Sequence, residues 1–279
     1  MNYRHAFHAG NFADVMKHAL LVWLLEALAR KPRPFFVLDT HAGPGFADLQ
    51  AEPATRTGEW RAGIGRLLAE TPPASGGGGT DDPLARYLAI VRGLGLYPGS
   101  PALIRALLRP GDRLACCELH PEDHARLRAR FARDPQVGVH LRDGYEAVKA
   151  LLPPPERRGL ILLDPPFESP DEFATLTQAL RTGLARFPAG VFAAWYPIKH
   201  RAPIRDFFAG LEGLRDLVAA ELWLRAPLDP GRLNGCGLLV ANPPYGFQAE
   251  APALLDALRA RLAEPGFGEG AAVTRLADE

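Results

Sequence analysis

Short runs of apolar residues recur along the chain and predict a buried parallel sheet. The first four runs cover residues 35–38, 113–117, 137–141 and 159–163. Runs of this length, bounded by turn residues, are typical of strands that are buried on both faces. Further strands are expected near residues 191, 219 and 236, which gives a sheet of about seven strands with a late antiparallel pair.

Helical periodicity occupies most intervals between these runs. Leucines at positions 20, 21, 24, 25 and 28 predict a helix that ends before Pro32. Helices are also expected at 171–187 and 203–211, so the chain alternates strand and helix as a doubly wound α/β fold does. The segment after Pro265 is rich in glycine and ends in polar residues, and we expect it to be frayed.

One interval is too long for a simple strand–helix–strand unit. An acidic residue usually follows the glycine loop of such a unit by about 20 residues, but Glu118 lies 75 residues beyond Gly43. We therefore expect an inserted, mostly helical subdomain at 48–100, within a main domain made of 1–47 and 101–279. The run 75–79, Ser-Gly-Gly-Gly-Gly, is expected to be a flexible linker.

Composition indicates an intracellular enzyme without pointing to a particular substrate. No apolar run approaches the ~20 residues that span a bilayer, and the start lacks a signal peptide's apolar stretch, so a cytoplasmic location is expected. Three cysteines suit a reducing compartment. The net charge is zero, so any contact with a polyanion must rely on a local basic cluster such as Lys199-His200-Arg201. The arginines at 126–133 are more simply explained as a solvated helix face.

The first predicted strand runs into Asp39-Thr-His-Ala-Gly43-Pro-Gly45, a pattern typical of a loop that binds S-adenosylmethionine. Glycines allow the backbone to approach a ligand closely. A dinucleotide loop would have a third glycine where Asp48 stands. Carboxylates at Asp39 and Asp48 would repel a pyrophosphate, whereas S-adenosylmethionine is cationic, so the pattern disfavours a nicotinamide cofactor.

Three further acidic residues follow the next three strands. Glu118 is placed to bind the ribose hydroxyls of an adenosyl group, and Asp143 to accept from its adenine amine. Asp164 follows the fourth strand. Since parallel strands end at the same edge of a sheet, these groups are expected to share the edge where doubly wound folds bind ligands.

Asp164-Pro165-Pro166-Phe167 is suited to bind an exocyclic amine. Such an amine needs acceptors for both of its hydrogens, which the Asp164 carboxylate and the Pro165 carbonyl supply on a rigid backbone. Phe167 supplies a ring on which a base can stack. A second turn of this shape, Asn242-Pro-Pro-Tyr245, comes much later. We expect it on a strand at the far edge, shaping the last hairpin, and assign the amine site to Asp164.

The amino terminus is dense in basic and aromatic residues. Tyr3 and Arg4 suit stacking and phosphate contact with an extruded nucleotide, and Lys17 and His18 are placed to meet a cofactor carboxylate. Several histidines lie here, but no metal-ligand spacing accompanies them, so no metal is expected.

Taken together, these motifs resemble the RlmJ family of bacterial 23S ribosomal RNA adenine-N6 methyltransferases over nearly the whole chain. The segments that carry the resemblance are Tyr-Arg-His-x-Phe-His-Ala-Gly-Asn at 3–11, Lys17-His18, the loop at 39–43, Arg56-Thr-Gly-Glu, Tyr97-Pro-Gly-Ser-Pro, Glu118-Leu-His-Pro, Arg158-Gly-Leu-Ile-Leu, Asp164-Pro-Pro and Trp195-Tyr-Pro. The resemblance implies a Rossmann-like methyltransferase with a small helical insertion, S-adenosylmethionine as donor and one adenosine of 23S ribosomal RNA as target.

Residue roles are also implied by the resemblance. Positions that match the family's cofactor site are His18, His41, Ser100, Glu118, Asp143, Gly144 and Asp164. Asp164 is in addition the catalytic residue of the family, and Tyr3 matches a tyrosine that contacts RNA. The chain departs from the pattern at Phe167, which replaces a commoner tyrosine, and at Pro44 within the glycine loop. A DNA adenine-N6 methyltransferase and a non-catalytic RNA-binding protein remain alternatives. We expect a monomer with no obligate protein partner.

Overall fold

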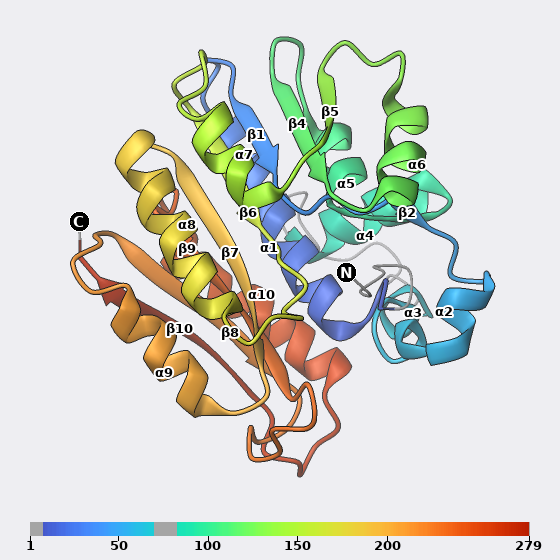
Figure 1. The fold of residues 1–279 in the computed structure, drawn as a ribbon. Helices are drawn as coiled ribbons and strands as arrows, with labels where there is room; N and C mark the ends of the chain where they lie inside the picture. The colour runs from blue at the N-terminus through green and yellow to red at the C-terminus, as the bar shows by residue number, and fades with distance from the viewer. Residues whose placement is uncertain (1–7, 70–82, 279) are drawn as a thin grey trace.

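The computed structural model of the chain describes residues 8–69 and 83–278 (Figure 1). Its centre is an eight-stranded sheet in the order β10-β8-β9-β7-β6-β1-β4-β5. The strands of this sheet are β1 (Phe36–Asp39), β4 (Arg113–Glu118), β5 (Val137–Leu141), β6 (Gly159–Leu163), β7 (Val191–Ile198), β8 (Leu217–Trp223), β9 (Gly235–Ala241) and β10 (Gly270–Ala277). The expected α/β fold is confirmed, with one strand more than the seven predicted.

Five neighbouring strands, β5, β4, β1, β6 and β7, run parallel to one another. Their carboxyl ends therefore meet along one edge of the sheet, which we call the carboxyl rim. The glycine loop, Glu118, Asp143 and Asp164 all follow these ends, as the order of apolar runs predicted. These polar residues therefore lie close together along the carboxyl rim.

The other three strands reverse direction by turns. β9 runs antiparallel between β7 and β8, with Gly235 opposite both Ile198 and Trp223. β8 consequently ends at the carboxyl rim, where β9 begins. The prediction that β9 lies at the far edge is wrong, and so is the predicted hairpin after it, because Asn242 leads into a helix. An apolar run does not encode the position of its strand within the sheet.

The expectation of a frayed carboxyl-terminal segment is also wrong. Gly266 and Gly268 adopt positive φ and turn the chain toward the free edge of β8, where β10 pairs antiparallel with it. Within β10, Ala271 and Val273 pack against one core layer, and Leu276 against the other. Because the side chains of this segment are small, the alternation was not visible in the sequence. The segment is ordered as a strand because the edge of β8 provides backbone hydrogen-bond partners.

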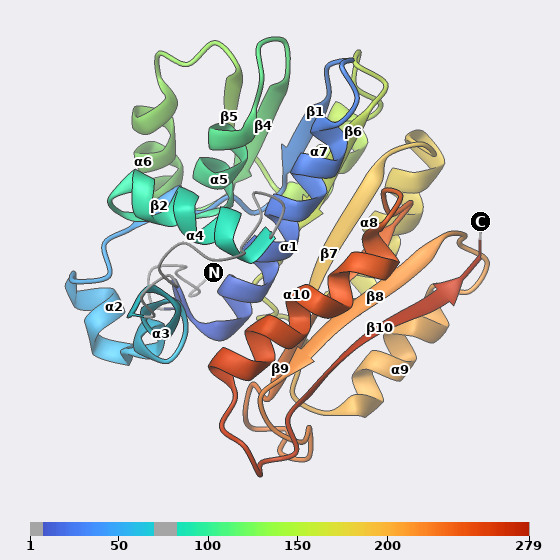
Figure 2. The same cartoon turned by 180° about the vertical axis from the view of Figure 1, so that it is seen from behind.

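Helices cover both faces of the sheet and complete a three-layer fold. One face carries α7 (Gly144–Leu151), α8 (Glu172–Arg186) and α9 (Arg201–Gly210), as Figure 1 shows. The other carries α1 (Phe12–Ala29), α4 (Pro83–Leu94), α5 (Ser100–Leu107) and α10 (Phe247–Leu262), as Figure 2 shows. α6 (Pro121–Phe131) packs beside β4 and β5. The predicted apolar face of α1 is present, but α4 and α10 also cover its other side, so nearly the whole helix is buried.

The segment between β1 and β4 contains the predicted helices. It comprises β2 (Phe46–Ala47), α2 (Glu52–Thr57), a 3-10 turn (Glu59–Arg61), α3 (Ile64–Ala69), α4 and β3 (Tyr97–Pro98), and α5 then leads into β4. β2 and β3 pair antiparallel where the segment leaves and rejoins the main domain. The linker predicted at 75–79 lies outside the described residues, and the division into two domains stays a prediction.

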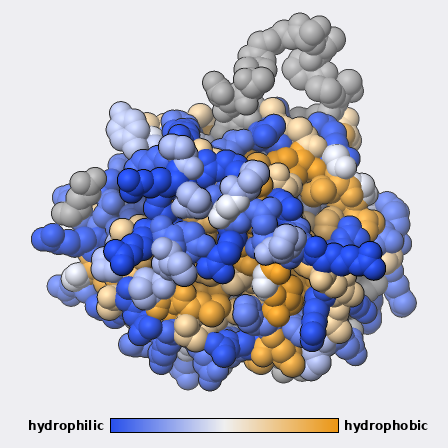
Figure 3. Space-filling model, turned by 90° about the horizontal axis from the view of Figure 1, so that it is seen from above, coloured by the Kyte–Doolittle hydropathy of each residue, from blue (hydrophilic) through white to orange (hydrophobic). Residues whose placement is uncertain are grey.

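The surface and the cysteines agree with the composition. Hydrophilic side chains predominate on the face seen in Figure 3, with apolar ones in separate patches. Across the described ranges, no helix is long and apolar enough to cross a membrane.

Cys116, Cys117 and Cys236 are buried free thiols, and burial raises the pKa of the Cys117 thiol to about 12. They serve as small apolar core residues.

Candidate active site

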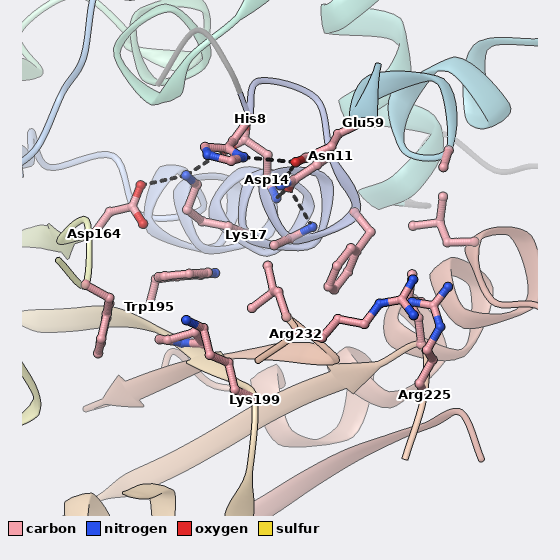
Figure 4. A pocket seen from close by; sticks show the side chains of 18 of the residues that line it. His8, Asn11, Asp14, Lys17, Glu59, Asp164, Trp195, Lys199, Arg225 and Arg232 are labelled. Carbon is pink, nitrogen blue, oxygen red and sulfur yellow. Dashed lines mark hydrogen bonds and ion pairs between the residues drawn. The ribbon is translucent and has the colours of Figure 1, made fainter. Parts of the chain in front are cut away.

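Two cavities meet at Asp164 on the carboxyl rim. A groove of about 680 Å³ is lined by the start of α1, the turn 164–167, Trp195 and the rim end of the antiparallel strands (Figure 4). A cavity of about 30 Å³ lies beside the glycine loop. Its lining includes five residues predicted to bind a cofactor: Lys17, His18, Gly43, Ser100 and Asp164. Asp14, Lys17 and Asp164 line both spaces and so form the boundary between them.

A buried lysine joins two carboxylates at this boundary. Lys17 Nζ donates to Asp164 Oδ2 at 2.6 Å and to Asp14 Oδ1 at 2.8 Å. Only 5% of Lys17 and 6% of Asp164 is exposed. Burial alone would lower the pKa of the Lys17 ammonium, but the two carboxylates outweigh it and raise that pKa above its usual range. Lys17 is therefore a permanent cation that holds Asp164 in place. Its predicted contact with a cofactor carboxylate stays a prediction.

Asp14 is a site residue that sequence reasoning missed. Burial would raise its pKa, but Lys17 and His18 hold the pKa well below its usual range. Gly10 N also donates to Asp14 Oδ2 at 3.0 Å. The sequence did carry a signal for Asp14, because it precedes Lys17 by three residues and thus shares its helix face.

The start of α1 is fixed by a second polar cluster. Asn11 caps the helix, its side chain accepting from Ala13 N and Asp14 N. Asn11 Nδ2 donates to Glu59 Oε2 at 3.0 Å, and the same carboxylate pairs with His8 at 3.0 Å. The inserted segment therefore braces the amino-terminal residues through Glu59, which the sequence marked only as the last residue of Arg56-Thr-Gly-Glu, without a role. Tyr3 and Arg4, predicted to contact RNA, lie outside the described residues.

The glycine loop is held by the acid that follows β4. Gly43 and Gly45 adopt positive φ, a conformation that glycine reaches without strain. Gly43 N donates to Glu118 Oε2 at 2.8 Å, and His120 N donates to Glu118 Oε1 at 2.7 Å. Glu118 thus fixes the loop as well as standing at the rim. Binding of ribose hydroxyls by Glu118 stays a prediction.

Asp39, at the end of β1, is fully buried, and neither carboxylate oxygen has a hydrogen-bond partner within the described ranges. The Ser100 hydroxyl and the His41 amide are close enough to lower its pKa somewhat, but neither makes a hydrogen bond of standard geometry. Burial dominates and raises the pKa of Asp39 to about 7, with a further increase from the Asp164 carboxylate. A buried carboxylate without donors favours a cationic ligand nearby.

Asp39→Asn is expected to stabilise the ligand-free protein, and more so at high pH. In the wild type, the folded state keeps a proton on Asp39 up to about pH 7, whereas the unfolded state loses it near pH 4. Wild-type stability therefore falls as pH rises through this window, and the asparagine variant lacks this term. The advantage of the variant should grow by about 2–3 kcal/mol between pH 5 and pH 8. Urea unfolding at both pH values measures it, and a constant difference would contradict the argument.

Besides Glu118, three predicted cofactor residues lie along the rim outside the small cavity. Asp143 caps α7, accepting from Tyr145 N and Glu146 N, and His41 packs edge-on against the Tyr145 ring at 5.2 Å. A Cβ atom on Gly144 would lie 2.1 Å from the Thr40 carbonyl oxygen. The first turn of α7 thus touches the loop after β1, which requires glycine at 144.

Gly144→Ala is accordingly expected to destabilise the protein by about 1–3 kcal/mol, since a backbone carbonyl cannot yield without moving the loop. Gly93→Ala is the matched control, because Gly93 lies within α4 and its Cβ would meet nothing within 4 Å. That variant should gain up to about 1 kcal/mol from helix propensity. Thermal unfolding of the pair tests the prediction, and equal melting temperatures would contradict it.

The Asp-Pro-Pro-Phe turn is rigid and strained. Pro165 is buried, and Phe167 adopts a φ of 52°, a conformation that bulky residues rarely occupy. The Phe167 ring packs edge-on against Phe173 at 4.8 Å and Trp195 at 5.7 Å. Both Phe167 and Trp195 line the groove. The turn therefore presents a fixed carboxylate and aromatic rings to the same space.

The rival turn lies at the other end of the strands, away from the carboxyl rim. β9 ends where β7 begins, with Ala241 opposite Phe192. Asn242 Nδ2 donates to the carbonyls of Pro188 and Gly190, both at 2.7 Å, and Tyr245 is 97% exposed. Asn242 closes a loop far from the groove.

A mostly parallel sheet, a glycine loop after β1 and acidic residues along the carboxyl rim are the features of the Rossmann-like, S-adenosylmethionine-dependent methyltransferases. The family model described as ribosomal RNA large subunit methyltransferase D, RlmJ, matches residues 32–274. The chain belongs to this RlmJ family.

Individual relatives agree over nearly the full length. Ribosomal RNA large subunit methyltransferase J of Haemophilus influenzae is 39% identical over 277 residues, which covers 96% of each chain. The protein of the same name from Escherichia coli is 38% identical with the same coverage. A crystal structure of a Legionella pneumophila protein superimposes with a TM-score of 0.86 at 33% identity, covering 96% of this chain and 98% of that one.

Proposed function

We propose that this protein methylates N6 of an adenosine in 23S ribosomal RNA, with S-adenosylmethionine as donor. The observation that carries the proposal is the position of Asp164. It directly follows β6, lines both the small cavity and the large groove, and begins a rigid Pro-Pro turn. A group in this position touches donor and acceptor at once. The RlmJ relatives are named as methyltransferases of large-subunit ribosomal RNA, which supports the substrate class.

The residues along the rim fit the donor. S-adenosylmethionine, when bound, supplies an electrophilic methyl group on a cationic sulfonium. The unpaired Asp39 carboxylate suits a cationic ligand, and the glycine loop leaves room for a close approach. The cavity of about 30 Å³ holds only one end of such a molecule. The remainder would extend along the rim toward Glu118 and Asp143.

The groove supplies the acceptor side. A flipped adenine would stack on the aromatic rings of the turn and place its amine between the Asp164 carboxylate and the Pro165 carbonyl. Because Lys17 Nζ donates to Asp164 Oδ2 and fixes the side chain, Asp164 acts first as a hydrogen-bond acceptor that orients the nitrogen lone pair toward the methyl group. The amine becomes strongly acidic only when methylated, so its proton can then leave to Asp164 or to water. We further propose that the protein acts in the cytoplasm as a monomer.

Transfer of labelled methyl from S-adenosylmethionine tests the proposal. The acceptors are protein-free large-subunit RNA, assembled large subunits and duplex DNA, followed by nucleoside analysis. Label in N6-methyladenosine from RNA is the expected result. Label only in DNA would make the protein a DNA adenine methyltransferase, and cofactor binding without transfer would favour a non-catalytic RNA-binding protein.

A further inference from the structure

Three basic residues stand on the carboxyl rim of the antiparallel half of the sheet. Lys199 follows β7, Arg225 follows β8 and Arg232 precedes β9, and all three line the large groove. The strand register aligns Ile198, Gly235 and Trp223, so segments distant in the sequence converge here. We call these three residues the cationic rim.

The cationic rim differs from the other charged residues that line the groove. Lys17 pairs with Asp14 and Asp164, Arg66 pairs with Glu264, and Glu59 pairs with His8. No member of the cationic rim forms an ion pair within residues 8–69 and 83–278. Lys199 and Arg232 are exposed, and the half-buried Arg225 guanidinium lies over the Phe267 ring at 5.9 Å without a carboxylate partner in those ranges. The rim therefore leaves a local positive charge on a chain whose net charge is zero.

Arg201, close to the cationic rim in the sequence, has a structural role instead. Arg201 donates to Glu221 Oε2 at 2.5 Å, and its guanidinium stacks on Trp223 at 4.7 Å. Arg201 was predicted together with Lys199 as part of one basic cluster. The two residues have different surroundings in the structure: Arg201 contacts Glu221 and Trp223, whereas Lys199 faces the groove (Figure 4).

The groove is continuous from the cationic rim to the Asp164 turn. Both belong to the same space of about 680 Å³, with Trp195 between them in Figure 4. A flipped nucleotide at the turn has a phosphodiester on each side, and the strand that carries it must leave along the groove. Lysine and arginine side chains in such a groove follow a single-stranded backbone without reading its sequence.

We propose that the cationic rim binds the backbone phosphates of the single-stranded nucleotides that flank the target adenosine. The inference rests on the proposed function, since it assigns the path of the RNA from the same site. It also separates this surface from the arginines of α6, which follow β4 on the other side of the glycine loop. The cationic rim positions the strand, and selection of adenine is left to the turn.

A triple variant tests the inference: Lys199→Ala, Arg225→Ala and Arg232→Ala together. The matched control is Arg126→Ala, Arg128→Ala and Arg133→Ala, which removes the same charge from exposed positions in and just after α6. Binding of a fluorescent single-stranded RNA with one central adenosine is measured over a range of salt concentrations. For the rim triple, the slope of log affinity against log salt should fall by about 2, from three lost phosphate contacts.

Kinetics with protein-free large-subunit RNA supply the second readout. The rim triple should raise KM for RNA by about tenfold or more, while kcat and the Kd for S-adenosylmethionine stay at wild-type values. Equal salt slopes and KM values in the rim and α6 triples would overturn the inference and leave the proposed function intact. Wild-type RNA binding that depends on the rim, without any methyl transfer, would instead refute the proposed function alone.

Discussion

Asp164→Ala is expected to lower the rate of methyl transfer by on the order of 1,000-fold or more, because the acceptor amine loses the group that orients it. The Kd for S-adenosylmethionine should change by less than about tenfold, equivalent to ~1.4 kcal/mol. Alanine also removes one of the two carboxylates around Lys17, so binding must be measured separately from rate. Single-turnover transfer to RNA and calorimetric cofactor binding provide the two measurements.

The control for Asp164 is Asn242→Ala, in the second Pro-Pro turn of the chain. That variant loses two hydrogen bonds to loop carbonyls and should lose about 1–3 kcal/mol of stability. Its turnover at a temperature where it remains folded should match the wild type. The reverse pattern, with activity lost in the Asn242 variant and kept in the Asp164 variant, would show that the amine site lies at the Asn242 turn and not at Asp164.

Lys17→Met should have the second largest effect, on both stability and activity. Removing the lysine leaves the buried Asp164 carboxylate without its cation and Asp14 with only His18 beside it, and an unpaired buried charge destabilises a protein by about 3–5 kcal/mol. Asp164 would also lose the partner that fixes its orientation. We expect transfer to fall at least about 100-fold in the folded variant.

The loss of stability in Lys17→Met should depend on pH in a defined direction. In the wild type the Asp14 pKa is depressed, so its contribution is complete above about pH 4 and is lost as pH falls. In the variant Asp14 loses the Lys17 ammonium while its burial remains, so the pKa of Asp14 rises and the stability that its ionisation contributes to the wild type is lost. Urea unfolding should therefore show the largest gap from wild type at pH 8 and the smallest near pH 4.

Lys149→Met, at an exposed position on α7, is the control for this series. It should change stability by no more than about 0.5 kcal/mol at any pH. A gap between Lys17→Met and wild type that does not vary with pH would show that the lysine acts through packing alone.

Much of the fold could be predicted because its signals are local. Buried parallel strands are continuous apolar runs, and in this chain a polar residue stands at or just after the carboxyl end of each run. Glu118, Asp143 and Asp164 were therefore correctly placed on one rim. Strand order is not local. The apolar pattern of β9 is the same whether it lies at an edge or between β7 and β8, and β10 depends on the free edge of another strand.

The candidate site was predictable as a set of residues but not as a set of contacts. Lys17 and Asp164 were each singled out, but their ion pair joins residues 147 positions apart. Spacing along the sequence predicts contacts only between residues of the same helix or neighbouring elements, so this pair could not be predicted. Of the cationic rim, only Lys199 was singled out from the sequence. Arg225 and Arg232 lie in a connection without motif character and gain meaning only through the register of β7, β8 and β9.

The packing of α1 also has a consequence for synthesis of the chain. This helix carries Lys17, leaves the ribosome early and is buried against α10, with Trp23 donating to Glu250 across a separation of 227 residues. Its Trp23 ring also packs on Phe247 at 5.3 Å. Burial of α1 therefore cannot finish until α10 has emerged, so one side of α1 stays uncovered until then. An enzyme proposed to modify ribosomal RNA would thus become active only after α10 has left its own ribosome.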